Sequence, residues 1–142
     1  MYRWRIVILT AVALLINTSA HGEADPPKKQ TDAEITKLLA GKWSTEEGKG
    51  DEPKVKSTVV YRKDATFAVQ ATIVTKEKTE VIELSGTWKV EDGVILDTIE
   101  KSNTEKYEKG RVTRDTVISI DEQTLRYTTA KGRERTWKRG KE

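Results

Sequence analysis

The sequence predicts an all-β domain in which one short helix precedes about eight antiparallel strands that close into an up-and-down β-barrel. From residue 42 onward, β-branched, aromatic and other apolar residues recur at every second position, which is the period of a strand with one buried face. Short turn segments separate these runs, and no proline stands inside any of them. Eight strands are enough to close a barrel and to remove both sheet edges. A two-sheet β-sandwich is the alternative arrangement.

Residues 1–20 are predicted to be a signal peptide. Arg3 and Arg5 precede an apolar run over residues 6–16, and small residues follow it up to Ala20. The run is shorter than the roughly 17–25 residues that a membrane-spanning helix needs. We therefore expect a secreted or periplasmic protein with no stable membrane span after signal cleavage.

Residues 21–30 carry a proline pair and several charges, and they are predicted to form a disordered linker. The folded domain is then expected over residues 31–142. Thr31 and Glu34 have the spacing of a capping box and predict a helix over residues 32–40.

This short helix is expected to lie against the rest of the domain. Ile35, Leu38 and Leu39 fall on one face, and a helix of this length is not stable alone. Gly41 suits the position just after a helix end.

The strands follow from the period of two and from the turns between them. We expect strands over residues 42–46, 54–63, 66–75, 79–90, 94–100, 111–120, 124–130 and 133–139. Turns are expected at 64–65, 91–93, 121–123 and 131–132, and a polar loop or extended ribbon at 101–111.

A Leu-x-Gly-x-Trp pattern occurs twice, in LLAGKWSTEEG at 38–48 and in ELSGTWKVEDG at 83–93. Gly41 precedes Trp43 by two positions, as Gly86 precedes Trp88, so each glycine shares a strand face with its tryptophan. The glycine leaves room for the indole ring or for a crossing strand. We interpret both stretches as places where a strand brings an indole to one core, rather than as two binding sites.

A helix followed by Gly41-Lys42-Trp43 resembles the start of lipocalin-like (calycin-type) domains. In that family the tryptophan closes one end of the barrel, and an arginine of the last strand lies across its ring. Arg135 and Arg139 are the candidates for that arginine here. The second half of the chain is similar to small secreted bacterial proteins of unassigned function. The resemblance covers about residues 31–142 and implies a barrel that is either filled by side chains or able to hold one small ligand.

Trp137 leaves two alternatives for the last strand. It shares a face with Arg133, Arg135 and Arg139, so that face is either an interior one with arginines near the barrel mouth or a basic, aromatic exterior stripe. Of the two candidates we favour Arg139 packing on Trp43, because an arginine over an indole gains a cation–π contact.

The composition excludes several chemistries. The chain has no cysteine, and its one histidine, His21, falls in the predicted linker. Catalysis by Ser–His–Asp or Cys–His groups, structural zinc, and haem held by His or Cys are therefore excluded from the folded domain. We expect no enzyme activity, no metal and no cofactor.

The charge balance argues against nucleic acid as a partner. Of the 26 basic residues, Arg3 and Arg5 lie in the signal, which leaves 24 against 23 acidic residues, mixed in sign along the chain. That pattern is typical of a solvated surface. The C-terminal KGRERTWKRGKE is the best argument for a polyanion at the cell surface.

Two functions remain. The first is an exported binding module that holds a small apolar ligand, with Trp43, Tyr61, Trp88 and Tyr127 as candidate lining. The second is a filled barrel whose outer surface meets a cell-envelope protein, or that has a structural role.

Overall fold

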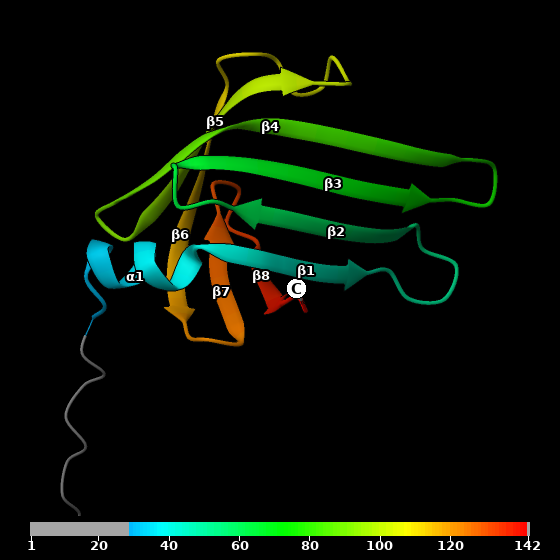
Figure 1. The fold of residues 1–142 in the computed structure, drawn as a ribbon. Coiled ribbons are helices and arrows are strands. Elements are labelled where there is room, and N and C mark those ends of the chain that lie inside the picture. Colours follow the sequence, from blue (N-terminus) through cyan, green and yellow to red (C-terminus); the bar gives the residue numbers. More distant parts are fainter. Residues whose placement is uncertain (1–28, 142) are drawn as a thin grey trace, which may run out of the picture.

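The computed structural model describes residues 29–141 as one helix followed by eight strands (Figure 1). The predicted signal peptide and most of the predicted linker lie outside the described residues. The elements are α1 (Asp32–Leu39), β1 (Gly41–Glu47), β2 (Lys54–Tyr61), β3 (Thr66–Val74), β4 (Thr79–Glu91), β5 (Val94–Ser102), β6 (Val112–Ile120), β7 (Thr124–Thr129) and β8 (Glu134–Arg139).

The strands form a closed antiparallel barrel in chain order, and this confirms the predicted fold over the sandwich. Closure comes from the pairing of β1 with β8, where Trp43 lies opposite Arg139 and Ser44 lies opposite Lys138. All other neighbours are joined by hairpin connections, so each strand pairs with the one that follows it.

Strand bounds differ from the prediction mainly at two places. The strand expected to reach residue 63 ends at Tyr61, because Arg62 N–H bonds to the Thr66 carbonyl and Ala65 takes a φ of 63° to close the turn. The polar segment after β5 is a loop, as expected, but β5 itself continues to Ser102 before the loop begins.

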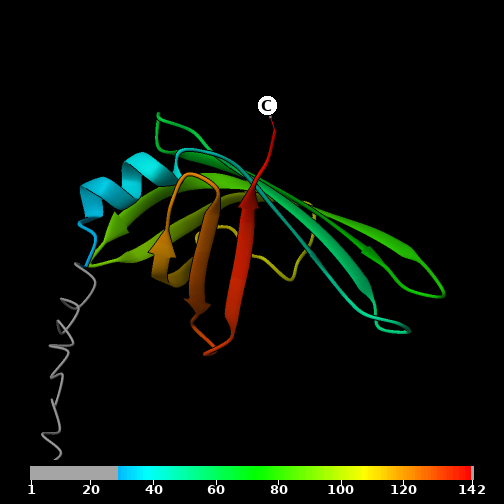
Figure 2. The same cartoon turned by 90° about the horizontal axis from the view of Figure 1, so that it is seen from below.

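The helix lies across one end of the barrel (Figure 2). Its predicted capping box is present: the Thr31 hydroxyl accepts from Glu34 N–H, and the Glu34 carboxylate accepts from Thr31 N–H at 2.8 Å. Ile35 and Leu39 are buried. The Asp32 carboxylate accepts two 2.8 Å bonds from backbone N–H groups of the β4–β5 turn, so the N-terminal end of the helix is fastened to the barrel.

Gln30, the last residue of the predicted linker, is attached to the barrel. Its side-chain amide donates to the Ile120 carbonyl at 2.9 Å, and its amide oxygen accepts from Ile120 N–H at 3.3 Å. The chain is thus held against β6 just before the helix begins.

The strands are unequal in length, which makes the barrel asymmetric. β4 has 13 residues, whereas β7 and β8 have 6 each. In Figures 1 and 2, the long β2–β4 side extends well past the short strands of the opposite side. The end away from α1 therefore has one tall wall and one short wall.

Gly86 is required by a close backbone crossing. The β4–β5 register shifts between Ser85 and Gly86, and a side chain at position 86 would overlap the Thr98 carbonyl of β5. Of the two roles predicted for this glycine, the structure shows the crossing strand. No helix in the described residues is long and apolar enough to cross a membrane.

Candidate ligand-binding site

The end of the barrel nearest α1 is sealed around Trp43. This indole is fully buried, and its Nε1–H donates to the Leu39 carbonyl at 2.8 Å. The Arg139 guanidinium carbon lies 4.1 Å from the centroid of the Trp43 ring. The predicted packing of Arg139 on Trp43 is thus confirmed.

Arg139 also caps the C-terminal end of α1. Its guanidinium donates to the Ala40 carbonyl at 3.0 Å and to the Leu38 carbonyl, and its Nε–H donates to the Glu122 carbonyl at 2.7 Å. A side chain at Gly41, which has a φ of 136°, would overlap the Arg139 Nη1 atom. The glycine of the first Gly-x-Trp therefore makes room for the arginine rather than for the indole.

Trp88 belongs to the same closed half. It is buried, its Nε1–H donates to the Arg62 carbonyl at 3.0 Å, and its ring meets Tyr61 in an edge contact with centroids 5.3 Å apart. Both indoles are held by backbone carbonyls, and neither lines the interior cavity described next. The structure therefore places Trp43 and Trp88 in the core and not in the predicted ligand wall.

A cavity of about 510 Å³ occupies the other half of the barrel. It is floored by buried residues such as Phe67, Ile99 and Leu125. At its outer end it is bordered by the 103–111 loop and the β7–β8 turn. The volume lies in the range of 300–1,000 Å³ that is usual for small-molecule sites. The barrel is therefore not filled by its own side chains.

The long strands give the cavity an almost wholly apolar wall. Side chains from β2, β3 and β4 alternate inward with the strand period. The apolar residues on this wall are Val55, Val59, Phe67, Val69, Ala71, Ile73, Ile82 and Leu84. Only Ser57 and the Tyr61 hydroxyl add polar groups.

The short strands and β5 give the facing wall a different chemistry. The hydrogen-bonding or charged residues there are Asp97, Thr113, Asp115, Tyr127, Thr129, Arg135 and Trp137. The cavity is thus amphipathic, with one side suited to hydrocarbon and the other to hydrogen bonds.

Asp97 is the most unusual group on the polar wall. Its side chain is 7% exposed, and its Oδ2 accepts from the Tyr61 hydroxyl at 2.9 Å. Oδ1 is buried and has no hydrogen-bond partner among the described residues. The pKa of Asp97 is raised to about 7, mainly by burial; the Tyr61 hydrogen bond lowers it in part, and the nearby Asp115 carboxyl adds a smaller upward shift.

Asp115, on β6, is a second carboxyl on this wall. Burial raises its pKa to about 6. Trp137 Nε1–H donates to the Tyr127 oxygen at 2.7 Å. Burial, and then the Asp115 charge, raise the pKa of the Tyr127 hydroxyl above its usual value.

Arginines and lysines gather at the outer end of the cavity. Arg135 is directed inward and forms an ion pair with Glu47 of β1, so it is not the arginine over Trp43. In the loop, Lys106 and Arg111 lie 5.8 and 5.6 Å from the Tyr107 ring centroid. Arg133 and Lys131 are exposed at the β7–β8 turn. The mouth is therefore cationic, while the inner wall carries carboxyls.

Of the four predicted ligand-wall residues, the structure brings Tyr61 and Tyr127 to the cavity. The prediction missed Asp97, Asp115 and Trp137 as wall residues. The sequence pattern could have identified Asp97, because it alternates with Ile95 and Ile99 on the inward face of β5. An acid at such a position is rare without a partner.

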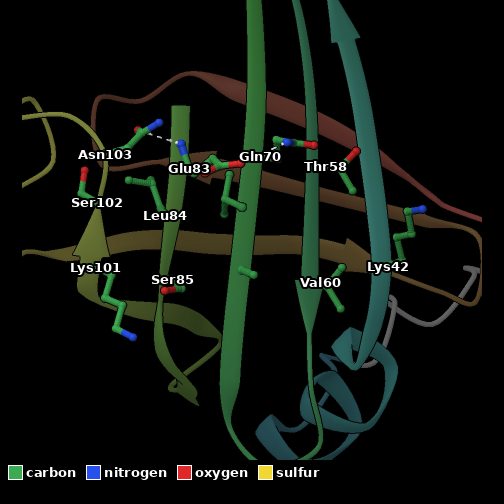
Figure 3. Close-up of a pocket in the computed structure, with 12 residues that line it drawn as sticks. Lys42, Thr58, Val60, Gln70, Glu83, Leu84, Ser85, Lys101, Ser102 and Asn103 are labelled. Atoms are coloured by element: carbon green, nitrogen blue, oxygen red, sulfur yellow. Dashed lines mark hydrogen bonds between the residues drawn. The ribbon is translucent and has the colours of Figure 1, made fainter. Parts of the chain in front are cut away.

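A second hollow, of about 700 Å³, lies on the outer faces of β1–β5 (Figure 3). Its polar groups bond to one another: Gln70 donates to Glu83 Oε1 at 3.3 Å, and Asn103 Oδ1 accepts from Glu83 N–H at 2.9 Å. Lys42 and Lys101 are exposed at its edges. Because its lining is open to solvent and internally bonded, the interior cavity is the stronger candidate.

Within residues 29–141, no group of three or more His, Cys, Asp or Glu residues is arranged to hold a metal ion. No protein-family model matches the chain, and no curated protein matches it. Among solved structures, a de novo designed fluorescence-activating β-barrel is similar, with a TM-score of 0.44 and 14% sequence identity. The match covers 78% of this chain and all of the designed one. The barrel assignment itself rests on the strand pairing described above.

Proposed function

We propose that this chain is an exported, lipocalin-like binding module that holds one small ligand inside its barrel and catalyses no reaction. The observation that carries the proposal is the cavity of about 510 Å³, closed at the α1 end and walled by apolar side chains of β2–β4. A ligand with an apolar face would remove that wall from water, at roughly 25 cal/mol per Å² of apolar surface.

Two further observations support the finer parts of the proposal. The lipocalin-like assignment is supported by Gly41-x-Trp43 after a short helix, with Arg139 across the indole. Export is supported by the signal-like sequence of residues 1–20. The alternative of a filled barrel is disfavoured because the interior retains the cavity.

A titration with Nile red, a neutral environment-sensitive dye, tests the proposal. Ala71 lines the cavity, whereas Ala68 of the same strand lines the outer hollow. We expect Ala71→Trp to block the rise in dye fluorescence and Ala68→Trp to leave it unchanged. The reverse result would move the site to the outer hollow, and no dye binding by the unmodified protein, together with no other ligand response, would refute the proposal.

Intrinsic fluorescence provides a second readout. Of the three tryptophans in the described residues, only Trp137 lines the cavity. A bound ligand should therefore change the emission of the unmodified protein and of Trp88→Phe, and the change should be largely lost in Trp137→Phe.

A further inference from the structure

The unpartnered Asp97 oxygen is the feature that the fold leaves without a structural role. Buried polar groups are nearly always hydrogen-bonded, and a buried acceptor without a donor costs about 1–3 kcal/mol. Tyr61 satisfies only Oδ2. Asp97 lies on the cavity wall, but Oδ1 itself has almost no accessible surface, so a ligand in the cavity would supply the missing donor after the carboxyl group turns toward the cavity.

The charges around Asp97 favour a cationic donor over a neutral one. On β6, the Asp115 carboxyl raises the free energy of the ionised Asp97. On β2 and β7, Tyr61 and Tyr127 face the pair as neutral hydroxyls with raised pKa values. Arg135, which lines the cavity from β8, is paired with Glu47. The inner wall thus holds two carboxyls and no unpaired cation among the described residues that line it.

The basic residues at the mouth do not provide that cation. Lys106, Arg111, Arg114, Lys131 and Arg133 are all exposed. Salt screens exposed charges over about 8–10 Å, whereas a charge-assisted bond within the cavity is screened much less. A small cation is therefore not barred from entering.

We propose that the cavity selects small apolar amines, with the ammonium or protonated nitrogen bonded to Asp97 Oδ1 and the hydrocarbon face packed on β2–β4. This inference rests on the proposed function and deepens it, because it names the ligand class of the same cavity. Asp97 supplies the specificity, and Asp115 adds charge without itself being the hydrogen-bond partner. The apolar wall sets the size and shape of the hydrocarbon.

Sets of an amine, an alcohol and a carboxylate that share one carbon skeleton show whether binding depends on the charge of the ligand or on its size. Suitable sets are 2-phenylethylamine, 2-phenylethanol and phenylacetate, with the corresponding hexyl and naphthylmethyl compounds, titrated by calorimetry at pH 8. We expect each amine that binds to do so at least tenfold more tightly than its alcohol, and the carboxylates to bind no better than the alcohols.

Asp97→Asn should remove this preference and bring the amine to the affinity of the alcohol. Asp51→Asn is the matched control, since Asp51 is exposed and pairs only with Lys76 at the surface. Circular dichroism checks that both variants retain the barrel. If Asp97→Asn does not fold, a pH series on the unmodified protein takes its place.

In that series, amine affinity should fall about tenfold per pH unit below pH 7, because the carboxyl that accepts the bond becomes protonated near its pKa of about 7. Alcohol affinity should remain flat. Alcohols or carboxylates that bind as well as the amines would overturn the amine proposal and leave the binding module standing. No binding by any compound or by Nile red would overturn both.

Discussion

Replacing Arg139 with methionine is the sharpest test of how the barrel is closed. The substitution keeps most of the aliphatic stem but removes the guanidinium. That group currently lies over Trp43 and bonds to carbonyls of Leu38, Ala40 and Glu122. It therefore joins the last strand, the C-terminal end of the helix and the β6–β7 turn.

The expected cost follows from these contacts. A hydrogen bond from a charged donor contributes about 1.5–3 kcal/mol when it is buried. Because Arg139 is only half-buried, we assign about 1 kcal/mol to each of its three hydrogen bonds. The cation–π contact adds about 0.5–1 kcal/mol. Arg139→Met should then lower the free energy of unfolding by about 3–4 kcal/mol. Arg139→Lys should lose about 2 kcal/mol, because one ammonium cannot reach three carbonyls in the geometry of the fork.

Urea unfolding followed by tryptophan fluorescence measures the effect. Arg126→Met is the matched control, since Arg126 is exposed on β7 and its partner is the exposed Glu134. Exposed pairs contribute about 0–1 kcal/mol. If Arg139→Met costs no more than Arg126→Met, the reasoning about the closed end is wrong.

Three further outcomes are expected. Gly86→Ala should cost about 3 kcal/mol, because the added methyl meets the β5 backbone. Gly140→Ala should cost less, about 1–2 kcal/mol, because the added methyl meets the stem of the Lys42 side chain and no backbone atom. Thermal unfolding compares the two variants. The pKa of Asp97 is about 7 in the folded state, which is higher than in the unfolded state. The contribution of Asp97 to the free energy of unfolding is therefore most favourable below about pH 4, and it is lost progressively as the pH rises from about 4 through about 7. Relative to Asp97→Asn, the unmodified protein should lose up to about 4 kcal/mol between pH 4 and pH 8, and parallel urea curves at the two pH values would contradict this. Asp51→Asn should leave the pH profile unchanged.

The fold could be predicted because its determinants are local. Period-two runs, short turns and the Thr31–Glu34 capping box each act within a few residues, and together they predict eight strands and one helix. Even the stacking of Arg139 on Trp43 could be expected, because an arginine in the last strand and a tryptophan in the first meet when the barrel closes.

The cavity could not be predicted in the same way, because its size depends on register and strand length around the whole barrel. The shift between Ser85 and Gly86 and the short β7 and β8 decide which side chains reach the interior. The sequence pattern predicts that Trp43 and Trp88 deliver their indoles to one core, and it leaves them as candidates for the ligand wall as well. The structure uses both to fill the closed half, and Trp137, the third tryptophan within residues 29–141, reaches the cavity instead.

The two halves of the barrel differ in how completely their polar atoms are used. At the closed end, the indole N–H groups of Trp43 and Trp88 and the Arg139 guanidinium all bond to backbone carbonyls. At the open end, Asp97 is buried with one oxygen unbonded, between two isoleucines where valine or isoleucine would satisfy the strand pattern. A buried carboxyl at such a position lowers stability at neutral pH, even though it accepts one hydrogen bond from Tyr61. An asparagine at 97 should thus make the protein more stable at pH 8 while abolishing its preference for amines, and that opposition between stability and binding is what distinguishes a ligand contact from a packing residue.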